Sequence, residues 1–115
     1  MPSPLRREKL SMVFKEELSK IVDREIDFPE GNLVTITKII ISDDGYYARV
    51  LLSILGKSPA ETLDMLKKNI YHIQQMLNRK VRVRPVPKIT FVLDREEFKR
   101  EVVERALAKI KREEE

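Results

Sequence analysis

Apolar residues recur along this chain with two spacings, and the change between them separates helical from extended segments. In residues 4–24 they lie three or four positions apart, the spacing that lines one face of a helix. These positions are Leu10, Val13, Phe14, Leu18, Ile21 and Val22. Ser3 and Pro4 suit the start of this helix, because serine caps free amides and proline is tolerated in the first turn. The pattern predicts an amphipathic helix that ends near Arg24.

Residues 33–55 have the pattern of two strands joined by a turn. Residues 33–41 (LVTITKIII) are rich in β-branched side chains, and residues 46–55 alternate between two faces. The face expected to meet the core consists of Ala48, Val50, Leu52 and Ile54, and the opposite face of Tyr47, Arg49, Leu51 and Ser53. In the turn, residues 42–45 (SDDG), aspartate is common and Gly45 can adopt a positive φ. The segment predicts a β-hairpin.

A second amphipathic helix is predicted over residues 59–78. It would begin with a capping box at residues 58–61 (SPAE), with proline at the first helical position. Its apolar stripe consists of Leu63, Leu66, Ile70, Ile73 and Leu77. Residues 81–87 follow as an extended connector, because their two prolines exclude a helix. Residues 88–93 then form a third strand. Its apolar face consists of Ile89, Phe91 and Leu93.

A last helix is predicted from residue 95. Residues 94–97 (DREE) can cap its start in the same reciprocal way. Its apolar stripe consists of Phe98, Val102, Ala106, Leu107 and Ile110. The order α-β-β-α-β-α predicts an α+β fold, with a three-stranded sheet and helices packed on one face. We expect residues 1–94 to form one domain, and residues 95–115 to form a helix that packs on it or extends from it.

The composition argues against several classes of function. The 115 residues include no cysteine, which excludes disulfides and thiolate chemistry. No apolar run approaches the roughly 20 residues that cross a bilayer, and the first ten residues lack a secretory signal, so we expect a cytoplasmic protein. The single histidine, His72, is best interpreted as a surface residue, and Asp43 and Asp44 as turn residues. The three glycines form no phosphate-binding loop. We therefore predict no catalytic site, no metal site and no cofactor.

Positive charge is concentrated in residues 65–93, which contain neither Asp nor Glu. The seven cations of this stretch are Lys67, Lys68, Arg79, Lys80, Arg82, Arg84 and Lys88. The whole chain has a formal net charge of only +4, so the remainder of the chain is net acidic. A local positive field attracts polyanions, of which phosphate backbones are the commonest. Nucleic-acid binding is the favoured interpretation. A solvated surface and a face for an acidic protein partner are the alternatives.

Two features of this stretch refine the prediction. Arg82 and Arg84 alternate with valines, so in an extended backbone their guanidinium groups would project from one side and bind phosphates through paired N–H groups. Tyr71 could stack on a base, although a half-buried helix residue with its hydroxyl group in water is the alternative. No heptad pattern predicts a coiled coil, and we expect a monomer.

Several short motifs follow one another in an order that is more specific than any of them alone. Residues 84–91 (RPVPKITF), followed by Asp94, are similar to the pattern Arg-x-Val-Pro-x-Leu/Ile-x-Phe-x-x-Asp. Residues 34–37 (VTIT) and the pair Arg6-Arg7 match upstream segments. The hairpin adds Ser42, Asp44, Ala48, Val50, Ser53 and Gly56. From Arg6 to Asp94 the chain resembles the bacterial ribosome-binding factor A family.

The resemblance implies a type II KH-like fold and a non-enzymatic protein. Such a protein binds the small ribosomal subunit and its 16S ribosomal RNA during late maturation and processing, and it supports growth in the cold. The resemblance adds Arg6 and Arg7 to the seven candidate RNA-binding cations, and it implies no membrane or small-molecule partner. The family usually has Ala-x-Gly at a kink between two helical halves, often followed by an arginine. Here residues 69–71 (NIY) and Gln74 stand at these positions, which leaves the kink open.

Overall fold

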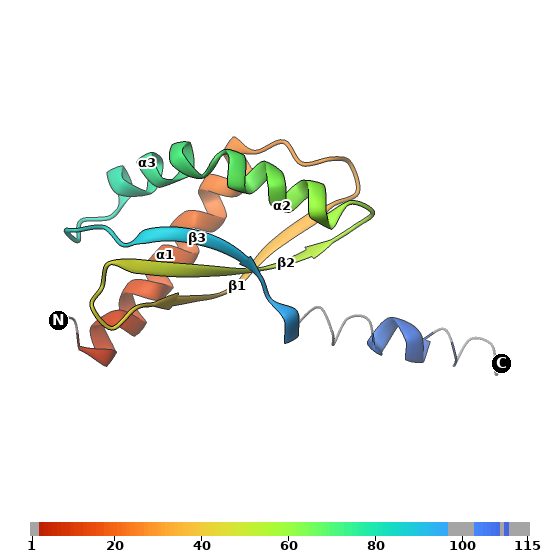
Figure 1. The fold of residues 1–115 in the computed structure, drawn as a ribbon, viewed down its shortest axis with the longest axis horizontal. Helices are drawn as coiled ribbons and strands as arrows, with labels where there is room; N and C mark the ends of the chain where they lie inside the picture. Colours follow the sequence, from red (N-terminus) through yellow and green to blue (C-terminus); the bar gives the residue numbers. More distant parts are fainter. Residues whose placement is uncertain (1–2, 97–102, 109, 111–115) are drawn as a thin grey trace.

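The computed structural model describes residues 3–96, 103–108 and 110. Its elements follow the predicted order except that two helices stand in place of the predicted middle one (Figure 1): α1 Pro4–Glu25, β1 Leu33–Ile41, β2 Tyr47–Leu55, α2 Pro59–Lys68, α3 Ile70–Lys80 and β3 Lys88–Leu93. The sheet has the order β1-β2-β3, with β1 antiparallel and β3 parallel to β2. A parallel pair needs a crossover connection, and α2 and α3 supply it.

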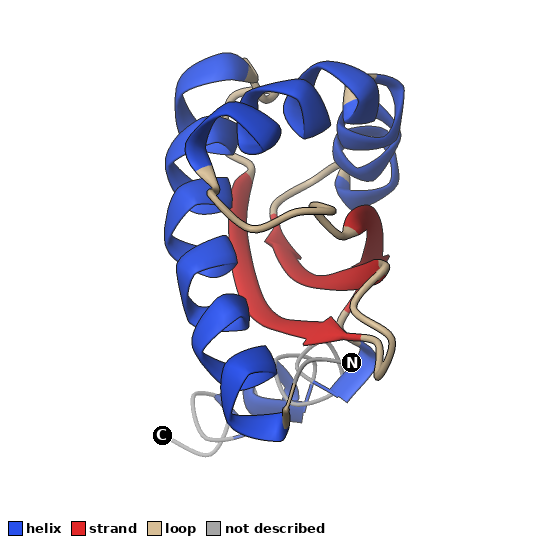
Figure 2. Cartoon of the chain, turned by 90° about the vertical axis from the view of Figure 1, so that its left-hand side faces the viewer, coloured by secondary structure: helices blue, strands red, loops and turns tan. Residues whose placement is uncertain are grey.

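Helices α1, α2 and α3 pack against one face of the sheet (Figure 2). The buried side of the helices includes Phe14, Leu18, Ile21, Leu66, Ile73 and Leu77, all with no exposed surface. Opposite them lie the alternate residues of β2, none more than 6% exposed: Ala48, Val50, Leu52 and Ile54. The predicted inward face of β2 and the predicted α+β arrangement are confirmed.

A β-bulge in β1 changes which of its side chains face the core. The pairing with β2 shifts between Ile36 and Lys38, which leaves Thr37 as the extra residue. Because of this shift, Ile36 and Ile39 are both buried although they are three positions apart. The Thr37 hydroxyl donates to Asp94 Oδ2 at 2.8 Å, which ties the bulge to the end of β3.

The helix predicted over residues 59–78 is divided in the structure, which ends α2 at Lys68 and begins α3 at Ile70, and the kink that the sequence left open is therefore present. Asn69 lies between them, and its Nδ2 donates to the Met65 carbonyl at 2.7 Å. An asparagine side chain that binds a carbonyl four residues back competes with regular helical hydrogen bonding. The helix therefore breaks at Asn69.

The two predicted helix starts differ in outcome. Ser3 caps α1 as expected, since its Oγ accepts the Arg6 N–H at 3.2 Å. The capping box at the start of α2 is wrong, because the Ser58 side chain makes no capping hydrogen bond. Ser58 Oγ instead accepts a hydrogen bond from Asn32 Nδ2 at 3.2 Å, and the Ser58 N–H donates to Asn32 Oδ1 at 3.2 Å. Asn32 thus fastens the loop before β1 to the start of α2.

The predicted last helix is described in part. Residues 103–108 are helical, and two residues of the expected apolar stripe, Leu107 and Ile110, are 60% and 51% exposed. Phe98 and Val102 of that stripe, and Glu97 of its predicted cap, lie outside the described residues. The division into residues 1–94 and 95–115 stays a prediction.

Candidate nucleic-acid interface

Contacts between distant segments bring the start of α1, the hairpin turn and the start of β3 to one end of the molecule. Arg7 Nη1 lies 2.7 Å from Asp43 Oδ1 in the turn. The Lys88 N–H at the start of β3 donates to the Tyr46 carbonyl at 2.8 Å. The end of α3 and the connector lie at this same end (Figure 1). We name five exposed cations here the basic end: Arg6, Arg79, Lys80, Arg82 and Lys88.

The end of α3 fixes where three of these cations lie. Arg79 and Lys80 occupy the last turn, where the free carbonyl groups of a helix favour positive side chains. Val81 then leaves the helix with an extended backbone, donates its N–H to the Leu77 carbonyl at 3.0 Å, and is buried. Val81 anchors the connector, so Arg82 follows it directly at the surface. Within the described residues, no hydrogen bond or ion pair engages the side chains of the basic end.

Arg84 has a different place from Arg82. Its Nη1 donates to the Val81 carbonyl at 2.8 Å and to the Val83 carbonyl at 2.7 Å, and its Nη2 donates to the Asn78 carbonyl at 3.2 Å. Arginine has five N–H donors, so three of them are used within the chain. Arg84 thus closes the end of α3, and its guanidinium group, unlike that of Arg82, is engaged by backbone carbonyls although both residues are exposed.

Arg7 also makes an intramolecular contact. Its pairing with Asp43 joins α1 to the hairpin turn, and its Nε is buried without a hydrogen-bond partner among the described residues. The turn itself is held by Asp44, whose Oδ1 accepts from Ser42 Oγ at 2.6 Å and from the Tyr46 N–H at 3.0 Å. These two hydrogen bonds, the first more strongly, hold the pKa of Asp44 below its ordinary value. The interpretation of Asp43 and Asp44 as turn residues agrees with these contacts.

Lys67 and Lys68 lie apart from the basic end, in the last turn of α2. Both are exposed, and Tyr71 follows one turn later with 76% of its surface exposed, so it is not the half-buried residue of the alternative interpretation. We name Lys67, Lys68 and Tyr71 the helix junction. The acid-free stretch of the sequence therefore divides into two separate surfaces. His72 lies beside this junction on the surface, with Nε2 3.4 Å from Glu25 Oε2.

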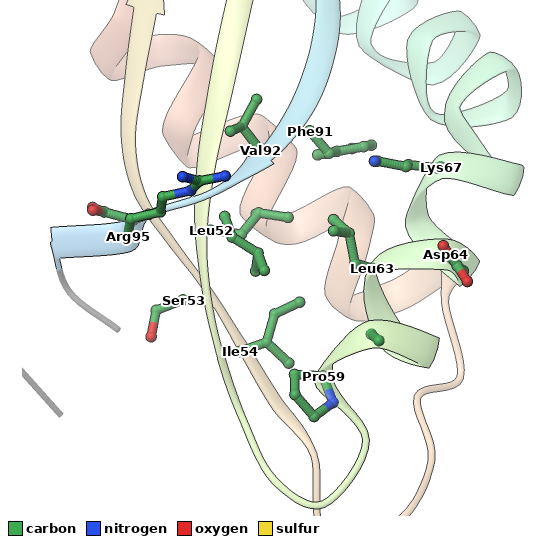
Figure 3. A pocket seen from close by; sticks show the side chains of 13 residues that line it. Leu52, Ser53, Ile54, Pro59, Leu63, Asp64, Lys67, Phe91, Val92 and Arg95 are labelled. Atoms are coloured by element: carbon green, nitrogen blue, oxygen red, sulfur yellow. The ribbon is translucent and has the colours of Figure 1, made fainter. Parts of the chain in front are cut away.

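An apolar groove occupies the other end of the sheet (Figure 3). It has a volume of about 770 Å³ and lies between α2 and the ends of β2 and β3. Leu52, Ile54, Leu63 and Phe91 are among its apolar lining residues, and Lys67 also lines it. No single sequence motif indicates this groove, because its lining comes from three elements.

Across the described part of the chain, no cluster of three or more His, Asp or Glu side chains could hold a metal ion. The helices described here also include none that is long and apolar enough to span a membrane.

The sequence pattern that defines the ribosome-binding factor A family matches residues 6–107. A relative of that name from Natranaerobius thermophilus is 37% identical over 94 residues, which cover 80% of this chain and 72% of the relative. The chain belongs to the ribosome-binding factor A family. The family resemblance inferred from the motifs is confirmed.

Solved structures of the family share the fold. The crystal structure of ribosome-binding factor A from Thermus thermophilus has a TM-score of 0.69 at 22% identity, covering 77% of this chain and 96% of that one. A Thermus thermophilus homology model fitted into a cryo-EM map of a 30S–RbfA complex has a TM-score of 0.64 at 23% identity, covering 73% and 90%. The expected α+β fold with a three-stranded sheet is therefore confirmed, and it is the fold of these family structures.

The departure from the family pattern at Gln74 has a structural counterpart. Gln74 Oε1 accepts the Ile89 N–H at 2.9 Å, and Gln74 Nε2 donates to the Pro87 carbonyl at 3.2 Å. Gln74 thus joins α3 to the start of β3. Because Gln74 stands where the resemblance implied an arginine, the chain has one positive charge fewer here. The glutamine instead holds the segment that presents Lys88.

Proposed function

We propose that this protein binds the small ribosomal subunit and its ribosomal RNA during late maturation, and that it acts by binding alone, without catalysis. The observation that carries the proposal is the basic end, where cations from three distant segments come together without partners of their own in the described chain. Family membership supports the same partner, because a relative's fold has been fitted into a 30S complex.

The physical basis of binding is exchange of counterions for protein cations. Each phosphate neutralised by Lys or Arg releases condensed counterions, so log K falls with log[salt] by about 0.7 per contact for single strands and about 0.9 for duplexes. The basic end supplies five such cations, and Lys67 and Lys68 supply two more at the helix junction. Four to six contacts would give a slope of roughly −3 to −5.

The nine candidate residues divide by role in this proposal. The two groups with exposed, unengaged side chains bind phosphates: Arg6, Arg79, Lys80, Arg82 and Lys88 at the basic end, and Lys67 and Lys68 at the junction. Arg7 and Arg84 add charge, and their intramolecular hydrogen bonds position the hairpin turn and the connector. Bound in this way, the protein would occupy and shape an immature RNA site and leave when maturation displaces it. We infer a cytoplasmic monomer with a role in growth in the cold.

Co-sedimentation with separated small and large subunits tests the proposal. Arg79→Glu/Arg82→Glu reverses two exposed charges of the basic end, and Lys20→Glu/Lys57→Glu reverses two exposed charges elsewhere. We expect salt-sensitive binding of the wild type to the small subunit, lost in the first double variant and kept in the second. Equal binding by both double variants would contradict the assigned site. Binding that survives ribonuclease treatment of the subunit would instead indicate an acidic protein partner.

A further inference from the structure

The outward face of the sheet carries positive charge that the linear sequence does not reveal. The helices pack on the other face, so alternate strand residues point away from the core. The three strands contain no Asp or Glu, and their three cations are Lys38, Arg49 and Lys88, all exposed. Only Lys88 belongs to the acid-free stretch. The pairing of β2 with β3, and not closeness in the sequence, brings Arg49 beside Lys88.

The register places an aromatic ring between two of these cations. Tyr47 of β2 lies opposite Lys88 of β3, and Arg49 lies opposite Thr90 one outward position further along. Neighbouring strands are about 4.8 Å apart, so the four side chains occupy one compact patch. Tyr47 is 58% exposed, and in the described chain no hydrogen bond or ion pair engages the Tyr47, Arg49 or Lys88 side chains. We name Tyr47, Arg49, Lys88 and Thr90 the sheet patch.

The chemistry of the sheet patch fits single-stranded RNA. An exposed ring flanked by cations can stack on a base while the cations hold the adjoining phosphates, and such stacking does not depend on the identity of the base. A duplex hides its base faces, and an acidic peptide would use the cations but offers nothing that must stack on the ring. The patch is also continuous with the basic end, because Lys88 belongs to both.

We propose that the sheet patch binds an unpaired RNA segment, with Tyr47 stacking on a base and Arg49 and Lys88 contacting the flanking phosphates. This inference rests on the proposed function, since it assumes an RNA partner. It adds to the basic end and the helix junction a further surface on the outward face of the sheet, and it names the structural class of RNA that this surface takes.

The test measures binding of the full chain to a short end-labelled oligouridylate and to a duplex of equal length. Tyr47→Ala should weaken single-strand binding by about tenfold, within the range of one lost base stack, while Tyr47→Phe keeps the ring and most of the affinity. Arg49→Gln should reduce the magnitude of the salt slope by about 0.7. Lys57→Gln removes an exposed charge at the opposite end of β2 and should change neither quantity. Duplex binding should be nearly insensitive to Tyr47→Ala.

Three outcomes would overturn the inference. Wild-type affinity in Tyr47→Ala would show that the ring binds no base, including the case in which another segment or a second copy covers this face. Loss of affinity in Tyr71→Ala but not in Tyr47→Ala would place stacking at the helix junction. An equal loss of duplex and single-strand affinity in Tyr47→Ala would show that the patch attracts RNA by its charge and that Tyr47 does not stack on an unpaired base. If Arg79→Glu/Arg82→Glu abolishes small-subunit binding while Tyr47→Ala changes nothing, the proposed function stands and the sheet patch fails.

Discussion

The two ends of the sheet offer different surfaces to a partner. At the hairpin end, the start of α1, the end of α3 and the start of β3 present five cations that are not engaged elsewhere in the described chain. At the other end, α2 and the ends of β2 and β3 enclose an apolar groove of about 770 Å³. Both ends are fastened by an amide side chain, Gln74 at the first and Asn32 at the second. An amide side chain holds each end, but only the hairpin end carries the unengaged cations. A mutation at the groove end should therefore lower stability without changing RNA affinity.

The largest expected effect comes from replacing each of these two amide side chains in turn. Gln74→Leu leaves the Ile89 N–H without its partner and should lower the free energy of unfolding by about 1–3 kcal/mol. It should also weaken RNA binding, because the segment that presents Lys88 loses its link to α3. Asn32→Ala should lower the stability by a similar amount and leave RNA affinity unchanged. Urea unfolding and RNA titration of both variants check this, and a loss of RNA affinity in Asn32→Ala would break the comparison.

A smaller effect should separate two arginines within the basic region. Arg84→Gln removes three hydrogen bonds to carbonyl groups and should lower the free energy of unfolding by about 1–2 kcal/mol. Arg82→Gln removes a side chain with no partner in the described chain and should change it by less than about 0.5 kcal/mol. Thermal unfolding of the two variants makes the comparison. Equal loss of stability in both would show that Arg84 does not close the end of α3.

The smallest effect concerns the hairpin turn. The folded-state pKa of Asp44 is lowered from 3.8 by the hydrogen bonds from Ser42 and Tyr46, so the ionised carboxylate stabilises the fold above that pH. This contribution is lost as the pH falls through the lowered pKa. The wild type should therefore lose more stability than Asp44→Asn between neutral pH and strongly acidic pH. Thermal midpoints at the two conditions measure this difference, and parallel pH profiles would exclude the role of Asp44.

The sequence predicted much of the fold and less of the site. The element order and the inward face of β2 follow from periodicity, since burial on one side repeats every second or every third to fourth residue. The break at Asn69 does not, because Leu66 and Ile73 fit one continuous stripe as well as two short ones. The bulge at Thr37 is hidden in a run in which nearly every side chain is β-branched and could face either side.

The density of charge along the sequence located the acid-free stretch. It did not show that the structure divides this stretch between the basic end and the helix junction. Arg82 and Arg84 look equivalent in the sequence, and only the end of α3 assigns one to carbonyl groups and leaves the other at the surface. Arg49 lies far from that stretch, and its place beside Tyr47 and Lys88 depends on the parallel register of β2 and β3. Residue type thus predicts chemistry, whereas partners within the fold decide which charged side chains remain unengaged at the surface.

The most direct test of this account is the salt dependence of binding to small-subunit RNA for Arg82→Gln, Arg84→Gln and Lys57→Gln. Arg82→Gln should reduce the magnitude of the slope of log K against log[salt] by about 0.7 to 0.9, the value of one phosphate contact. Lys57→Gln should leave the slope unchanged. Arg84→Gln should lower the free energy of unfolding by about 1–2 kcal/mol and change the slope less than Arg82→Gln does. Wild-type slopes in Arg82→Gln would contradict the claim that the unengaged cations of the basic end bind RNA phosphates.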